Sequence, residues 1–247
     1  MKDFLLVIPA YREHLRLPPF FEELIQILSK TSFSTAVQVV DDGSPLPEQE
    51  AMKEIVQERE VGACTILSPL FLSQNQGKGG AILAGWRHGP ETTWKAFVDA
   101  DGAVPAHEVR RLLEQIQNEN NPQLTLIGSR NLCGKQTVKR SWFRHLLGRI
   151  FSAIVSLMTD IRIKDSQCGI KILPTTAFKK MDSQLKETSF AFDVELLVAL
   201  QSQNIEIRET PIDWTEQPGG KLSVLKDGLK MLIQLIRLRH EFRAVTK

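Results

Sequence analysis

Two aspartates one residue apart follow an apolar run, in the segment Phe97-Val98-Asp99-Ala100-Asp101-Gly102. Side chains at positions i and i+2 of an extended segment point to the same face. Asp99 and Asp101 can therefore converge on one hard cation, whose preferred ligands are oxygens. Asp and Gly also favour turns, and for these residues alone a plain turn is the stronger interpretation. The rest of the chain changes that balance.

A second acidic pair, Asp41-Asp42, is followed by Gly43. Neighbouring side chains of an extended segment point to opposite faces, so both can serve one site only if the glycine makes a turn. One carboxylate would then accept hydrogen bonds from a nucleobase or ribose, and the other would support the loop. An exposed turn without a ligand fits the pair equally well.

The segment Asn75-Gln76-Gly77-Lys78-Gly79-Gly80-Ala81 precedes a predicted helix. Its glycines let the backbone approach a ligand closely, and the amino end of a helix favours anions. A helix start without a ligand is the alternative. The Walker pattern requires Gly where Leu72 stands and Ser or Thr where Gly79 stands, so a P-loop ATPase is disfavoured. A dinucleotide-dependent dehydrogenase is disfavoured too, because no G-x-G-x-x-G follows the first predicted strand.

Three later residues carry chemistry only in combination with others. Asp193 stands at the start of a predicted helix, where an acid also caps and complements the helix dipole. Arg130, taken alone, fits a solvated loop residue better than a phosphate ligand. Cys168 is interpreted as a half-buried structural thiol and not as a nucleophile.

The elements that must position these residues alternate between short β-rich runs and longer helical patterns. The expected strands are 4–8, 37–40, 64–67, 96–98 and 124–127, and the expected helices are 18–28, 48–60, 78–88 and 105–117. Such alternation predicts an α/β fold with a mainly parallel sheet covered by helices on both faces. Ligands of these sheets bind at the carboxyl ends of the strands. Four polar clusters directly follow predicted strands and should share that edge: 9–13, 41–44, 99–101 and 128–130.

Composition narrows the class of protein. The chain has 247 residues, a net charge of +2 and 42% hydrophobic residues, which is typical of a packed globular protein and too balanced for nucleic acid as the main partner. Its three cysteines include no C-x-x-C pair, which fits a reducing cytoplasm. Neither a signal peptide nor a spanning helix is expected, so any contact with a membrane would be at its surface.

Two predicted helices fall in the second half of the chain. One runs from 140 to 158 and is unusually apolar, and the other runs from 222 to 243 with apolar and basic faces. Both could lie at a membrane interface, or they could pack on the core or form a dimer contact. We predict one continuous domain, residues 1–221, followed by a C-terminal amphipathic helical segment, residues 222–247.

Taken in order, several of these motifs resemble the family 2 glycosyltransferases of GT-A fold, and within them the polyprenyl-phosphate hexosyltransferases. The motifs are Val7 to Glu13, Val39 to Ser44, Asn75 to Ala81, Asp99 to Asp101 and Gly128 to Arg130. Later segments are especially similar to the dolichyl-phosphate β-glucosyltransferase branch. They are Asp165 to Lys171, Phe192 to Leu197, Trp214 to Glu216 and Ile236 to Arg239. The resemblance spans nearly the whole chain.

The resemblance implies a role for each matching residue. The base of the nucleotide would be surrounded by Pro9, Tyr11, Glu13 and the Asp41-Asp42 pair. Lys78 and its glycines would border the same pocket, Asp99 and Asp101 would hold ribose and a Mg²⁺ or Mn²⁺ ion, and Arg130 and Lys221 would face phosphates. The usual general base of the family corresponds to Asp193. The substrate-binding residues implied are thus Pro9, Tyr11, Glu13, Asp41, Asp42, Asn75, Gly77, Lys78, Gly79, Asp99, Ala100, Lys171 and Lys221, with Asp193 and Arg130 as catalytic residues.

The chain departs from the resembling families at a few places. Ala103 stands where mannosyl relatives often carry glutamine, which favours the glucosyl branch and leaves metal ligation thinner. Gly220 precedes Lys221 where that branch often has serine. The eukaryotic glucosyl enzymes usually carry an amino-terminal membrane anchor, which is not expected here, so surface attachment would replace it.

The function expected from the resemblance is metal-dependent, inverting transfer of a hexose from a nucleotide-sugar donor to a polyprenyl phosphate acceptor. Glucose from UDP-glucose is the expected donor, and the cytoplasmic face of a membrane is the expected location. Alternatives are a mannosyl or other hexosyl donor, a soluble acceptor, and a nucleotide-sugar-binding protein without turnover. A nucleotidyltransferase fits less well, because no Gly-rich, Arg- and Lys-containing signature follows the first strand. A homo-oligomer is left open.

Overall fold

The computed structural model describes residues 2–130, 163–189 and 191–217, together with the backbone of 138–139. The predicted helices 140–158 and 222–243, the C-terminal segment 222–247 and Lys221 lie outside these residues. Within the described residues, no helix combines the length and apolar character that crossing a bilayer requires.

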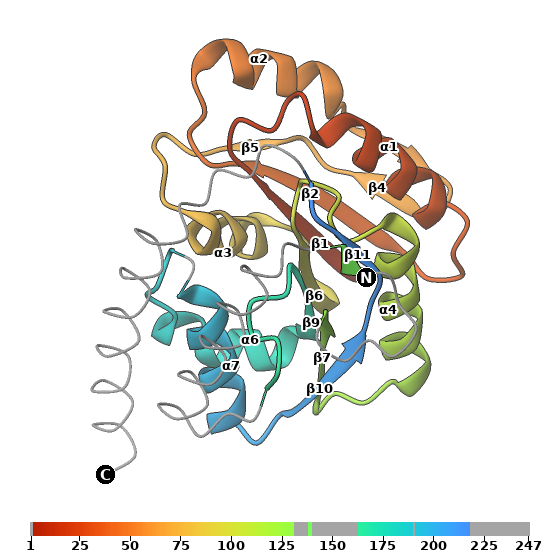
Figure 1. The fold of residues 1–247 in the computed structure, drawn as a ribbon, viewed down its shortest axis with the longest axis vertical. Coiled ribbons are helices and arrows are strands. Elements are labelled where there is room, and N and C mark those ends of the chain that lie inside the picture. The colour runs from red at the N-terminus through yellow and green to blue at the C-terminus, as the bar shows by residue number, and fades with distance from the viewer. Residues whose placement is uncertain (1, 131–137, 140–162, 190, 218–247) are drawn as a thin grey trace.

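A nine-stranded, mainly parallel sheet forms the centre of the molecule (Figure 1). Its strands run in the order β10-β7-β9-β6-β1-β2-β4-β3, with β5 also paired to β2. Their bounds are β1 Lys2–Ala10, β2 Thr35–Asp41, β3 Arg59–Val61, β4 Cys64–Ile66, β5 Leu70–Phe71, β6 Thr92–Val98, β7 Leu124–Ser129, β9 Ile170–Pro174 and β10 Glu206–Pro211. A separate parallel pair joins β8 (Val138–Lys139) to β11 (Trp214–Thr215).

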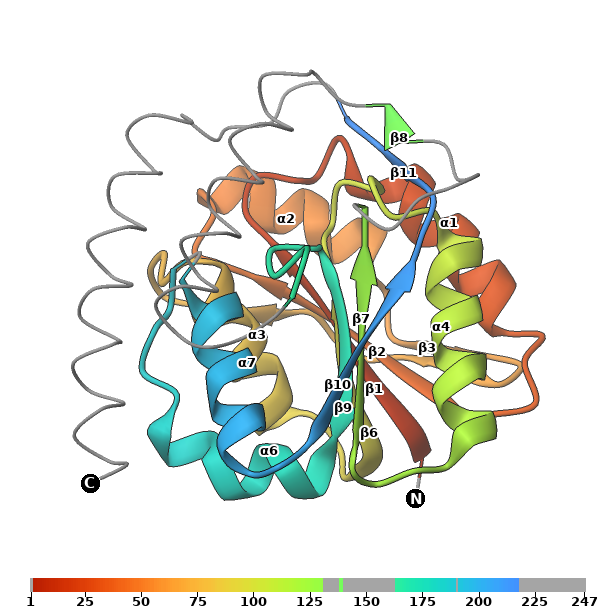
Figure 2. The same cartoon turned by 60° about the horizontal axis from the view of Figure 1, so that its bottom comes forward.

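Helices cover both faces of the sheet, as Figure 2 shows. Helices α1 (Leu17–Leu28) and α4 (Ala106–Glu119) contribute to the core on one face, and α3 (Lys78–His88), α6 (Thr175–Met181) and α7 (Phe192–Ser202) contribute to the core on the other. The central strand β1 supplies both cores, because successive side chains alternate between faces. Phe4 and Leu6 join the first core, whereas Leu5 and Val7 join the second.

Most predicted elements are confirmed to within a few residues, and the α/β sheet is confirmed as mainly parallel. The helix predicted at 48–60 is wrong in its second half. Helix α2 (Leu46–Ile55) ends at Ile55, and 59–61 form strand β3, which pairs antiparallel with β4. The edge position of this hairpin explains the error, because pairing with β4 supplies the strand conformation that local sequence pattern does not indicate.

The four polar clusters meet at one edge of the sheet. The strands β1, β2, β6 and β7 that precede them are parallel neighbours or are separated only by antiparallel β9. Strand β9 brings a fifth segment to the same edge, because it begins at Ile170, opposite Val98 at the end of β6. Residues 163–169 therefore enter beside the Asp99–Asp101 loop.

Candidate active site

The predicted metal pair lies where β6 ends. The backbone N–H of Asp99 donates to the carbonyl of Gly169 at 2.9 Å, so the loop before β9 is joined to the start of this turn. Asp101 Oδ1 accepts a hydrogen bond from the backbone N–H of Ala103 at 3.0 Å, and Gly102 adopts a left-handed φ of +70°. The segment is thus also a turn, and the two interpretations of its sequence are compatible.

A row of alternating charges starts at Asp99 and leads into the protein. The Lys78 ammonium lies 2.9 Å from Asp99 Oδ1 and 3.4 Å from Asp193 Oδ2. The other oxygen of Asp193, Oδ1, accepts from the ammonium of Lys171 at 2.5 Å. Exposure falls along the row, because the Asp99 side chain is 36% exposed whereas those of Asp193 and Lys171 are 1% and 0% exposed.

The buried charges of this row compensate one another. Burial lowers the pKa of Lys78, but the carboxylates of Asp193 and Asp99 outweigh burial and raise that pKa above its ordinary value. The Phe97 ring also lies 4.9 Å from the Lys78 ammonium and 5.3 Å from that of Lys171. Lys171 donates in addition to the carbonyl of Cys168 at 3.0 Å. Two lysines and two aspartates thus form a neutral set whose members are fixed by one another.

Asp99 and Asp101 fit a divalent metal ion. Burial raises the pKa of Asp101, and the nearby Asp99 carboxylate raises it further, so the two anions repel each other and a shared cation would relieve that repulsion. Among the described residues, Oδ2 of either aspartate has no hydrogen-bond donor. Two carboxylates are also the usual protein contribution to a Mg²⁺ site that is completed by water and substrate phosphates.

The acidic pair after β2 supports the surrounding loops. Asp42 accepts from the backbone N–H groups of Gln76 at 2.7 Å and Gly77 at 2.8 Å, and Asp41 Oδ1 accepts from that of Ser44 at 2.8 Å. Both aspartates are buried. The supporting role that the sequence suggested for one carboxylate is therefore filled by both, and Asp42 fixes the loop that precedes Lys78.

The glycines of that loop allow close approach of another segment. Gly77 has a φ of +90°, and a Cβ at this position would lie 2.5 Å from the carbonyl oxygen of Thr188. A Cβ at Gly79 would lie 2.5 Å from Cβ of Phe192 on α7. Asn75 donates to the carbonyl of Asp42 at 3.2 Å. The motif therefore seats α3 against the start of α7, which brings Lys78 to Asp193.

The loop after β1 lies beside the acidic pair. Arg12 has a φ of +57°, and its backbone N–H donates to Ser44 Oγ at 2.9 Å. Glu13, predicted near the nucleotide base, accepts from Arg16 Nε at 2.7 Å. The Tyr11 ring lies 5.4 Å from the Arg12 guanidinium. Pro9, on β1, is partly buried, and Ala100 is buried.

Arg130 is held at the end of β7 by a buried carboxylate. Its Nε donates to Asp165 Oδ2 at 2.8 Å and its Nη2 donates to Oδ1 at 2.6 Å. Burial raises the pKa of Asp165, but the Arg130 guanidinium outweighs it and leaves that pKa below its usual value of 3.8. The guanidinium also lies 5.3 Å from the Trp214 ring. Arg130 is thus a fixed residue and not the freely solvated one that its sequence context alone favours.

Asp165 and Trp214 were not predicted as site residues, although both stand in motifs that carried the family resemblance. The sequence contained these motifs as a signal. Neither strand β9 nor strand β10 was predicted, however, so the predicted elements did not place Asp165 or Trp214 near Arg130. Cys168 is fully buried and not half-buried as predicted, and burial raises the pKa of its thiol to about 12.

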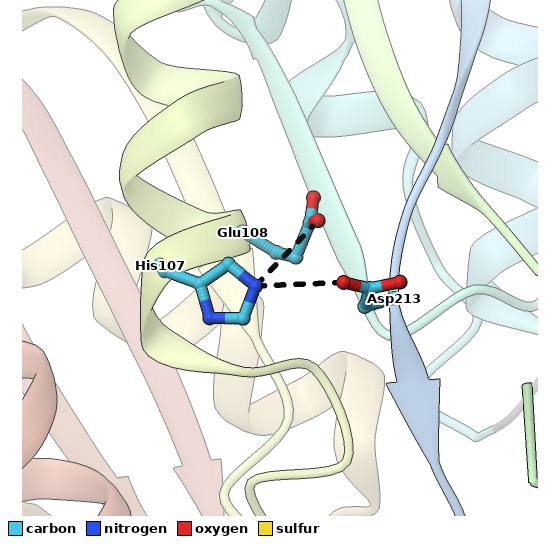
Figure 3. A group of neighbouring side chains, drawn as sticks. All are labelled: His107, Glu108 and Asp213. Atoms are coloured by element: carbon cyan, nitrogen blue, oxygen red, sulfur yellow. Dashed lines mark ion pairs between the residues drawn. The ribbon is translucent and has the colours of Figure 1, made fainter. Parts of the chain in front are cut away.

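A group of three potential metal ligands lies at the amino end of α4 (Figure 3). His107 Nε2 is 3.7 Å from Glu108 Oε1 and 3.7 Å from Asp213 Oδ2. Glu108 Oε2 accepts a hydrogen bond from Nε of Arg111, and Nη2 of Arg111 donates to the carbonyl of Pro211. These contacts hold the strand that leads to Trp214 against α4, and the group does not include the predicted metal pair.

Comparison with known proteins agrees with this geometry. The model of the family described as "Glycosyl transferase family 2" matches residues 5–181. The chain belongs to glycosyltransferase family 2. It is 34% identical over 251 residues to the human dolichyl-phosphate β-glucosyltransferase, with 97% of this chain and 76% of that protein covered. The enzyme of the same name from Saccharomyces cerevisiae is 31% identical, with 95% and 73% covered. Its place in the dolichyl-phosphate β-glucosyltransferase branch is thereby confirmed.

Solved structures show the fold of this family 2 glycosyltransferase to be GT-A. Glucosyl-3-phosphoglycerate synthase from Mycobacterium tuberculosis, in complex with Mn²⁺, UDP-glucose and glycerol 3-phosphate, superimposes with a TM-score of 0.67 at 12% identity, covering 96% of this chain and 78% of that one. A mannosyltransferase from Pyrobaculum calidifontis, in complex with GDP-mannose and Mn²⁺, gives a TM-score of 0.58 at 15% identity, with 100% and 67% covered. At these identities the likeness supports the fold alone.

Proposed function

We propose that this glycosyltransferase transfers glucose from UDP-glucose to a polyprenyl phosphate in a reaction that depends on Mg²⁺ or Mn²⁺. The observation that carries the proposal is the pair Asp99 and Asp101 beside Lys78, at the carboxyl edge of a GT-A sheet. Relatives at 30–34% identity are dolichyl-phosphate β-glucosyltransferases, which supports glucose as the sugar and a polyprenyl phosphate as the acceptor.

The chemistry divides between bond making and charge neutralisation. The bond between the anomeric carbon and the UDP oxygen breaks, its electron pair stays on the diphosphate, and an acceptor phosphate oxygen bonds to the same carbon. A β-linked product from the α-linked glucose of UDP-glucose requires inversion. The metal, when bound, would offset charge on the leaving diphosphate. Lys78 and Arg130 would add fixed positive groups that need no reorganisation.

The acceptor needs no general base. A phosphate monoester has a second pKa of about 6, so it is largely a dianion at neutral pH. Both oxygens of Asp193 face ammonium groups, those of Lys171 and Lys78. This supports a role for Asp193 in holding the two lysines, and not in removing a proton.

We place the reaction at the cytoplasmic face of a membrane. A polyprenyl phosphate resides in a bilayer, so the enzyme would work at the membrane surface. The absence of a disulfide pattern in the sequence favours the reducing side.

The test is transfer of label from a panel of UDP- and GDP-hexoses into organic-extractable polyprenyl phosphate, with Mg²⁺, Mn²⁺ or chelator. We expect labelled lipid from UDP-glucose only, lost with chelator and reduced at least about 100-fold in Asp101→Asn. Asp182→Asn is the matched control, because Asp182 is a partly exposed carboxylate that pairs with Arg87 away from the site. Labelled lipid from a different donor would correct the sugar. Binding of UDP without transfer from any donor would refute the proposed reaction.

A further inference from the structure

Arg130 has hydrogen-bonding capacity left after its pairing with Asp165. A guanidinium carries five N–H donors, and Asp165 takes one from Nε and one from Nη2. The Arg130 side chain is 13% exposed and that of Asp165 is 3% exposed, so the pair is nearly closed to solvent. The remaining donors point in directions that the Asp165 carboxylate fixes, because a bidentate pair sets the plane of the guanidinium.

Asp165 is in turn held by Glu209, which lies on β10. Glu209 Oε1 accepts from the backbone N–H of Asp165 at 2.9 Å, and its Oε2 accepts from that of Lys164 at 2.9 Å. Ser129 Oγ, at the end of β7, also donates to Oε1 at 3.1 Å. One carboxylate therefore joins the segment 164–165 to two strands of the sheet.

The charges of this set restrict how Arg130 can act. The Arg130 guanidinium pairs with Asp165, whose backbone N–H is bound by the Glu209 carboxylate, so the three side chains together carry a charge of −1. A set with a net negative charge does not attract anions at long range. It favours a phosphate through directed N–H bonds at short range, which makes the orientation of the guanidinium decisive.

We propose that Glu209 is a positioning residue that orients the Arg130 guanidinium toward a substrate phosphate, acting through Asp165. The phosphate belongs to the donor diphosphate or to the acceptor, and the inference rests on the proposed function only in that Arg130 meets one of them. Glu209 itself touches neither substrate. The hydrogen bonds that Glu209 accepts from two backbone N–H groups fix the position of the segment 164–165. The position of this segment fixes the Asp165 carboxylate, which in turn orients the Arg130 guanidinium.

The experiment compares Glu209→Gln with the wild-type enzyme in direct binding. Glutamine keeps the shape, but its amide nitrogen cannot accept from a backbone N–H, so one of the two backbone bonds is lost. The probes are UDP against uridine and a short-chain prenyl phosphate against the corresponding prenol. We expect the Kd of one phosphate ligand to rise about tenfold, as for one lost hydrogen bond to a charged group, and uridine to bind as before.

Two controls separate positioning from a general loss of structure. Glu206→Gln makes the same change on the same strand, at a side chain that is 51% exposed and pairs with Arg208, and it should leave all four probes unaffected. Glu209→Gln should add no further loss to Arg130→Ala, because its effect passes through Arg130. Should Glu209→Gln fail to fold, Asp165→Asn breaks the same series of contacts between Glu209 and Arg130. It should show the same selective loss of phosphate binding.

The inference is overturned if uridine binding falls as much as UDP binding, if both phosphate ligands bind normally, or if the loss persists in the Arg130→Ala background. Comparison of UDP binding with prenyl phosphate binding also shows whether Arg130 contacts the donor phosphate or the acceptor phosphate. Failure of the proposed function would give a different result. The wild-type enzyme would then form no glucosyl lipid, although the Kd values of wild type and Glu209→Gln would still differ as expected.

Discussion

Removing the negative charge of Asp193 should destabilise the protein strongly. Asp193→Asn leaves the Lys171 ammonium, which is 0% exposed, with only neutral acceptors such as the carbonyl of Cys168. Breaking a buried ion pair from one side costs about 3–5 kcal/mol of the free energy of unfolding. For a chain of this size, that corresponds to a Tm about 6–20 °C lower.

The compensating change should restore much of this loss. Lys171→Met removes the other half of the pair with little change in volume, and replacing a whole buried pair by neutral groups is often nearly neutral in stability. We expect the double variant Lys171→Met/Asp193→Asn to recover at least half of the stability lost in Asp193→Asn. Lys171→Met alone should cost less than Asp193→Asn, because Asp193 still faces Lys78 at 3.4 Å.

The assay is thermal unfolding followed by circular dichroism, with urea unfolding as a second measure. Asp182→Asn serves as the surface control, since exposed pairs contribute about 0–1 kcal/mol. An Asp193→Asn protein that melts within 2 °C of wild type would refute the argument. So would a double variant that melts no higher than Asp193→Asn.

Three further predictions address the rest of the site. Gly169→Ala should lower kcat/KM for UDP-glucose at least about tenfold, because a Cβ there would lie 2.2 Å from Asp99 Oδ2 and displace it; full activity in steady-state kinetics would contradict this. Asp165 has a lowered pKa in the folded state, so its contribution to stability is present above its usual pKa of 3.8 and is lost as pH falls through the folded value. The Tm of wild type should therefore fall more steeply below about pH 4 than that of Asp165→Asn, and parallel Tm curves between pH 2.5 and 7 would show that the pair with Arg130 is not the cause. Cys168, with its thiol pKa raised to about 12, should resist iodoacetamide at pH 8 until the protein is unfolded, as peptide mass spectrometry would show.

Local sequence patterns were enough to predict the edge of the sheet where the candidate site lies. Apolar runs such as 4–8 and 96–98 are buried on both faces and are too short for helices, so they predict strands of a covered parallel sheet. Polar residues directly after four such strands then fall at one edge by topology alone. The structure confirms this placement for the Asp41-Asp42 and Asp99–Asp101 segments.

Strands that depend on distant partners were not predictable. Strand β9 runs antiparallel between β6 and β7, and its five residues are all buried. Nothing in the five residues of this strand specifies its direction or its neighbours, because these follow from which gap in the sheet the chain can close. The helix predicted through 56–60 failed for the same reason.

The sequence by itself determined the types of charged group available, the order of the motifs and the family that their spacing resembles. Only the tertiary structure decided which charges meet. Lys171 and Asp193 are 22 positions apart, and Arg130 and Asp165 are 35 apart, yet the members of each pair bond directly. A buried charge is tolerated only beside its counter-charge, so the fold that buries these residues also assigns each one its partner and, with it, the direction in which it can act.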